Sequence, residues 1–103
     1  MYVDIGAEKL FTAEKEGRKI AVEVKSFIGK SEVKDLRDAL GQFFLYRFVL
    51  SEDEPDRVLY LAMKEDAFGE ILEDIPGQKL IRAMQLKLIV FNEITEEIVQ
   101  WIE

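Results

Sequence analysis

The chain has 103 residues, of which 14 are basic and 21 acidic, so its formal net charge at neutral pH is −7. It contains no cysteine and no histidine. This excludes disulfide scaffolds, thiol nucleophiles, serine–histidine hydrolases and metal sites built on sulfur or imidazole. Any metal would therefore be a hard cation bound by oxygen ligands.

The length predicts one domain spanning residues 1–103. Residues 1–34 carry seven basic and six acidic groups, residues 35–66 four and eight, and residues 67–103 three and seven. This acidity argues against broad, non-specific nucleic-acid binding, although the N-terminal third leaves room for a local electropositive groove. With no membrane-spanning apolar run and no signal peptide visible, we expect a soluble cytoplasmic protein that does not enter a membrane.

The first part of the chain is predicted to be extended. Residues 2–13 are predicted as a strand that Gly6 and Ala7 interrupt as a bulge. Glu16 and Gly17 signal a turn into the clearest strand, residues 18–27. In that strand, alternation predicts Ile20, Val22 and Val24 on one face and Ala21, Glu23, Lys25 and Phe27 on the other.

A long helix is predicted next, from Glu32 to Leu50, with Ser31 as its N-cap. The acidic stretch 51–56 is predicted as a solvated loop. Residues 58–63 are apolar throughout, which is typical of a strand buried on both faces.

The last third is predicted to contain a helix over 65–74 that residues 75–77 close, and a second helix over 78–85. A strand over 86–91 follows, and a turn at Asn92 and Glu93 leads to a last strand over 97–102. Trp101 is interpreted as an anchor for that strand, whose exposed edge is a candidate interface. The whole order predicts an α/β fold with a mixed sheet flanked by helices.

Glu23 and Lys25 form the most informative pattern, because residues two apart in a strand project to the same side. Together with Asp4 on the preceding strand, they are candidates for a catalytic site. Asp4 and Glu23, with the backbone carbonyl of Val24, would supply oxygen ligands for Mg²⁺ or Mn²⁺. Lys25 would orient an attacking water or stabilise charge developing on a phosphate.

The register of a simple hairpin does not favour Asp4. A turn at Glu16 and Gly17 places Leu10 opposite Glu23, so a bulge must shorten the offset, and Glu8 is kept as a competing second ligand. The alternative interpretation of Glu23 and Lys25 is an ordinary solvated ion pair on one strand face.

Gln42 and Tyr46 lie four residues apart on the predicted helix and therefore share a face. They are candidates for holding nucleic acid or ordering metal-bound water. The alternative is that Tyr46 belongs to the core and that Gln42 is an ordinary helix-surface residue.

Several blocks of the sequence closely resemble the XisH family, cyanobacterial factors named for control of excision of the fdxN element, a DNA rearrangement of heterocyst differentiation. These blocks are residues 2–10, 20–27, 39–44, 54–62 and 98–102. The resemblance covers essentially the whole chain. The family in turn resembles the PD-(D/E)xK nuclease superfamily, which implies a restriction-endonuclease-like fold.

This resemblance assigns roles to individual residues. Asp4 matches the first metal-binding acid of the superfamily, and Glu23 and Lys25 match its second motif. Gln42 and Tyr46 resemble the Gln-x-x-x-Tyr motif of the RecB-like branch. In one departure, the resemblance leads us to expect no counterpart in residues 1–103 of the N-terminal helix and strand that family members carry.

Two functions are consistent with these observations. The first is a nuclease-like factor, a magnesium-dependent endodeoxyribonuclease that acts in excision of a DNA element. The second is a non-catalytic regulator that acts through a XisI-like protein partner, because the family usually occurs as a pair with XisI, and DNA is a further candidate partner. A homodimer is a further expectation, since the chain is small and has an exposed edge strand.

Overall fold

The computed structural model describes residues 2–5, 8–25 and 32–103, and it describes the side chains of residues 14–25 and 33–103. Within these residues, six strands form one sheet in the order β1-β2-β3-β4-β5-β6. The strands are β1 (Tyr2–Ile5), β2 (Glu8–Lys15), β3 (Arg18–Val24), β4 (Val58–Lys64), β5 (Leu88–Asn92) and β6 (Glu97–Ile102). The central pairs β3–β4 and β4–β5 are parallel, whereas the outer pairs are antiparallel. The sheet is therefore mixed, as the order of elements predicts.

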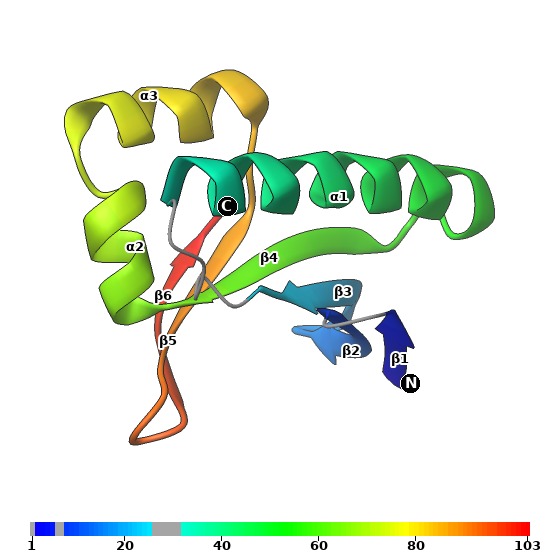
Figure 1. Ribbon diagram of the computed structural model, residues 1–103. Coiled ribbons are helices and arrows are strands. Elements are labelled where there is room, and N and C mark those ends of the chain that lie inside the picture. Colours follow the sequence, from blue (N-terminus) through cyan, green and yellow to red (C-terminus); the bar gives the residue numbers. More distant parts are fainter. Residues whose placement is uncertain (1, 6–7, 26–31) are drawn as a thin grey trace.

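The described residues also form three helices, which lie on one side of the sheet (Figure 1). They are α1 (Glu32–Asp53), α2 (Glu65–Ile71) and α3 (Ile75–Met84). The α1 helix connects β3 to β4, while α2 and α3 connect β4 to β5, as parallel crossovers require. This α/β arrangement is consistent with a restriction-endonuclease-like fold. No helix in the described part of the chain is both long and apolar enough to span a bilayer.

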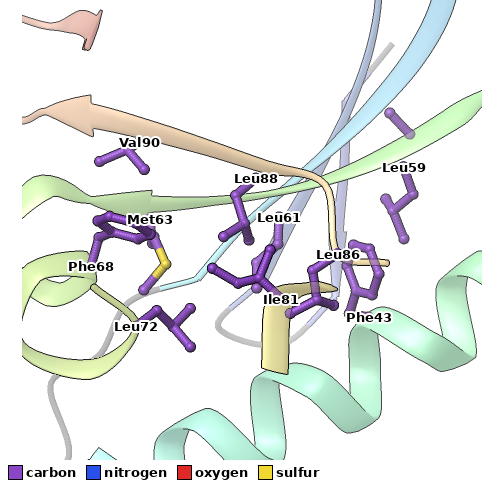
Figure 2. Packing of buried hydrophobic residues seen from close by; sticks show 11 residues of the cluster. Phe43, Leu59, Leu61, Met63, Phe68, Leu72, Ile81, Leu86, Leu88 and Val90 are labelled. Atoms are coloured by element: carbon purple, nitrogen blue, oxygen red, sulfur yellow. The ribbon is translucent and has the colours of Figure 1, made fainter. Parts of the chain in front are cut away.

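The main core fills the space between the helices and the sheet, because alternate strand residues point toward the helices. Leu59, Leu61 and Met63 on β4 meet Phe43 of α1 and Phe68 of α2, and all five side chains are buried (Figure 2). The five consecutive buried residues 59–63 confirm that β4 is covered on both faces.

A smaller apolar cluster lies on the opposite face of the sheet, and its buried members are Ile20, Tyr60, Ala62 and Ile89. Trp101 packs against this cluster, with its ring edge-to-face on Tyr60 at a centroid distance of 5.3 Å. The interpretation of Trp101 as an anchor for the last strand is confirmed.

The predicted turn and the face assignment of β3 are both confirmed. Glu16 and Gly17 have positive φ values of 52° and 80° between β2 and β3, as a two-residue hairpin turn requires. Ala21 and Glu23 point to the helix side, while Ile20 and Val22 belong to the opposite face. Phe27, the predicted bulge at Gly6 and Ala7, and the predicted N-cap Ser31 lie outside the described residues.

The prediction of one strand over residues 2–13 is wrong. The chain reverses between Ile5 and Glu8, which are register partners in an antiparallel pair. Two residues suffice to join antiparallel strands, so the extended pattern on either side did not reveal the reversal. As a consequence, the strand that carries Asp4 pairs with β2 and does not neighbour β3.

Two predicted helix boundaries are also wrong. The first long helix continues to Asp53, beyond the predicted end at Leu50. The first signal against helical geometry is Pro55, which disfavours that geometry in the residue before it. Pro76 opens α3 and does not close the preceding helix. Asp74 caps α3, since its side chain accepts a hydrogen bond of 2.8 Å from the backbone N–H of Gly77, and a proline in the first helical turn loses no hydrogen bond.

Candidate functional site

Glu23 lies in the middle of the sheet, on the face that the helices cover. Its register partners are Leu10 on β2 and Leu61 on β4. It has no exposed surface, and it is the one buried charged residue among the described side chains. Glutamate is rarely fully buried unless it is paired or ligated. This burial separates Glu23 from an ordinary solvated carboxylate on a strand face.

Lys25 follows two residues later, immediately after β3, and is half-buried. Its backbone N–H donates a 3.1 Å hydrogen bond to the carbonyl of Ala62, which continues the parallel pairing of β3 with β4. This bond holds the residue in extended geometry next to Glu23, so the two residues lie on the same side of the sheet. A shared role of Glu23 and Lys25 stays a prediction.

The ammonium group of Lys25 also lies within electrostatic range of Asp38 on α1. The pKa of the Asp38 carboxyl is lowered, first by a hydrogen bond of 2.9 Å from Lys34 and then by the charges of Lys34, Arg37 and Lys25. Asp38 itself is exposed and forms an ion pair with Lys34, four residues before it on the same helix.

Gln42 and Tyr46 both lie on α1 and are half-buried. Tyr46 packs against the same core cluster that contains Leu61, the register partner of Glu23. The interpretation of Tyr46 as partly core is therefore confirmed. Because α1 covers the face on which Glu23 lies, Gln42, Tyr46 and Glu23 are on the same side of the sheet.

Asp4 is described only by its backbone, which lies two strands away from Glu23. Asp4 pairs with Lys9 on β2, and Lys9 in turn pairs with Val24 on β3, whereas Glu23 pairs with Leu10. Glu8 begins β2, the strand next to β3, and lies two residues from Leu10. The register thus brings the backbone of Glu8 nearer to Glu23 than that of Asp4.

Divalent cations such as Mg²⁺ need several oxygen ligands, of which carboxylates are the strongest. The buried carboxylate of Glu23 fits such an ion chemically, and Val24 would contribute only its backbone carbonyl, since its side chain lies on the opposite face. Among the side chains that the structure describes, no group of three or more acids gathers to hold a metal. Asp4 and Glu8, the two predicted candidates for a second carboxylate, lie outside the residues whose side chains are described.

Comparisons with known proteins identify close relatives of this chain. The family model described as XisH protein matches residues 1–99. A crystal structure of a XisH family protein from Nostoc punctiforme superposes with a TM-score of 0.85 at 37% identity, over all of this chain and 83% of that chain. A fdxN element excision controlling factor protein from Anabaena variabilis superposes with a TM-score of 0.85 at 39% identity, over all of this chain and 82% of that chain. A search of curated proteins found no match.

Proposed function

This chain belongs to the XisH family, and from that premise we propose that it is a nuclease-like factor controlling excision of a DNA element. The control of fdxN element excision is the role in the description of the relative from Anabaena variabilis. The nuclease part of the proposal rests on the site on β3.

The single observation that carries the nuclease proposal is the complete burial of Glu23 beside Lys25. A buried carboxylate costs free energy unless a cation or hydrogen bonds compensate it. A fully buried glutamate is therefore a candidate functional residue. A lysine two residues away on the same side supplies positive charge at that place. This combination is expected of a site that binds a metal and a phosphate group.

In the proposed site, Glu23 and a second carboxylate, from Asp4 by resemblance or from Glu8 by register, would hold Mg²⁺ or Mn²⁺, with the Val24 carbonyl as a further ligand. The bound cation would neutralise charge that develops on a phosphodiester during hydrolysis. Lys25 would orient the attacking water and stabilise the same charge. Gln42 and Tyr46, on the covering helix, would position the nucleic acid or the water molecules around the ion.

Glu8 is the alternative second carboxylate. It lies on β2, which neighbours β3. By strand alternation its position belongs to the same face of the sheet as Leu10, the register partner of Glu23. Asp4 has the resemblance to the first metal-binding acid in its favour, and Glu8 has the register. The isosteric variants Asp4→Asn and Glu8→Gln distinguish them, because only loss of a true ligand would weaken Mn²⁺ binding.

The test of catalysis is a DNA cleavage assay with Mg²⁺ or Mn²⁺ on linear and supercoiled substrates. We expect the parent chain to cleave, and Glu23→Gln and Lys25→Ala each to lower the rate at least about a hundredfold. The control is Lys19→Ala, which removes an exposed lysine of the same strand. Circular dichroism would establish that each variant is folded. Equal cleavage by parent and both site variants would contradict the proposal.

The second candidate function is a non-catalytic regulator that acts through a XisI-like protein. The observation that favours it is the acidity of the chain, because residues 35–66 and 67–103 each carry a net charge of −4. Such a surface repels the DNA backbone outside a local site and is better suited to a protein partner. Co-purification with a XisI-like protein, undiminished by Glu23→Gln, is the expected result. Failure to associate would count against this function.

A further inference from the structure

The α1 helix presents a second apolar surface that faces away from the sheet. Its inner face is buried through Ala39 and Phe43. On the outer side, Leu45, Phe48 and Val49 are exposed by 60%, 63% and 45%. Their spacing of three and four residues places them on one side of the helix. We call these three residues the outer patch of α1.

An exposed glycine lies one turn before the outer patch. Gly41 precedes Leu45 by four residues, so the two positions are neighbours along the helix. A Cβ atom added at Gly41 would meet no atom within 4 Å. Because glycine has no side chain, a large apolar side chain of another helix can approach the backbone at this position.

The charges at the two ends of the same face are opposite. Lys34 lies seven residues before Gly41, and Glu52 lies seven residues after Leu45. Both Lys34 and Glu52 are exposed. An antiparallel copy of α1 that seats Leu45 on Gly41 therefore brings Lys34 of each chain next to Glu52 of the other.

The end of α1 gives a separate reason for a cation at this place. The last turn contains Glu52 and Asp53 and no basic residue. Acidic side chains are unfavourable at a helix C-terminus, where the backbone carbonyls already carry partial negative charge, and a cation is favourable there. A neighbouring chain would supply this cation through Lys34, which within its own chain donates a hydrogen bond to Asp38.

We propose that the chain forms a two-fold symmetric dimer through the outer patch of α1, with the two helices antiparallel. The contact is self-complementary, as closed dimers require: apolar residues meet in the middle and opposite charges meet at both ends. The occupant of this face is a second copy of the chain. This proposal does not depend on metal binding or on catalysis, because the outer patch points away from the face that carries Glu23.

The test is sedimentation equilibrium of the full chain from low to high micromolar concentration. The parent is expected to be a dimer, and Leu45→Asp to be a monomer with an unchanged circular dichroism spectrum. The matched control is Ile94→Asp, which changes an isoleucine that is 91% exposed in the β5–β6 turn and should leave the dimer intact.

A charge exchange tests the orientation of the helices. Lys34→Glu and Glu52→Lys should each weaken the dimer about tenfold, since each reversal acts twice in a two-fold contact. The double variant carrying both changes should restore it. A monomeric parent, or a dimer that Leu45→Asp leaves intact, would overturn the proposal. A monomer that associates through this face only with a different protein would also overturn it.

Discussion

Leu10 on β2 is the register partner of Glu23 on β3, so a whole strand separates Glu23 from the strand that carries Asp4. Two acids are therefore candidates for the second metal ligand beside Glu23. The acid with the strongest resemblance to a metal ligand is Asp4, and the acid whose backbone lies on the neighbouring strand is Glu8. Glu23 is common to both arrangements, and its burial makes it the residue on which the account of function depends.

The carboxylate of Glu103 connects the end of the chain to three other strands, and it makes stability depend on pH. It accepts hydrogen bonds from Tyr60, from Arg18 at 2.8 Å and from Lys15 at 3.3 Å. The bonds from Tyr60 and Arg18 are the main causes that lower the pKa of Glu103 from 4.5 to about 2. Because the folded pKa is lower than the unfolded pKa, this stabilisation is present above pH 4.5 and is lost as the pH falls toward 2.

We therefore expect Glu103→Gln to have a lower melting temperature than the parent at neutral pH, and the difference to shrink below pH 4.5. Thermal unfolding followed by circular dichroism across this range measures the effect. Glu97→Gln, which changes an exposed acid at the start of β6, the strand that ends just before Glu103, is the control and should show no such convergence. A constant difference between Glu103→Gln and the parent at every pH would contradict this explanation.

The phenol of Tyr60 is expected to titrate at a higher pH than an ordinary tyrosine. Its burial, followed by its hydrogen bond to Glu103, raises its pKa from 10 to about 12. Because the folded pKa is higher than the unfolded pKa, this interaction stabilises the fold below pH 10 and is lost as the pH rises toward 12. The difference in phenolate absorbance between the parent and Tyr60→Phe, followed as the pH rises, should have its midpoint near pH 12. A midpoint near 10 in the folded protein would show that the phenol is neither buried nor bonded.

Two helical glycines should respond in opposite directions to the same substitution. A Cβ atom at Gly77 would overlap the backbone of Leu72, whereas at Gly69 it would meet nothing within 4 Å. We expect Gly77→Ala to destabilise the protein by about 1–3 kcal/mol through overpacking. Gly69→Ala should stabilise it by about 0.5–1 kcal/mol through helix propensity. Urea unfolding of both variants measures these values, and a neutral Gly77→Ala would contradict the packing of α3 against α2.

The sequence predicted those parts of the fold that local patterns determine. Alternation in residues 18–24 identified both faces of β3, and Glu16 with Gly17 identified the turn. The reversal between Ile5 and Glu8 was missed because the residues on both sides are equally extended, and only the pairing of whole strands distinguishes a bulge from a hairpin. Pro76 was misread for a related reason, since proline both follows one helix and begins the next.

The candidate site could be predicted in part for the same reasons. Glu23 and Lys25 are two residues apart on one strand, so their shared side follows from local geometry. Gln42 and Tyr46 share a helix, but their placement over the face of Glu23 depends on the crossover from β3 to β4. The complete burial of Glu23 depends on how α1 packs on the sheet, which no local pattern encodes. The choice between Asp4 and Glu8 likewise depends on pairing across three strands.

The measurement that tests the central claim most directly is calorimetric titration of the chain with Mn²⁺, comparing the parent with Glu23→Gln. Glu14→Gln, which changes an exposed acid on β2, is the matched control, and Asp4→Asn and Glu8→Gln identify the second ligand. We predict that the parent and Glu14→Gln bind Mn²⁺ and that Glu23→Gln does not, while remaining folded. A folded parent that binds no Mn²⁺, or a Glu23→Gln variant that binds it as the parent does, would contradict the proposed metal site.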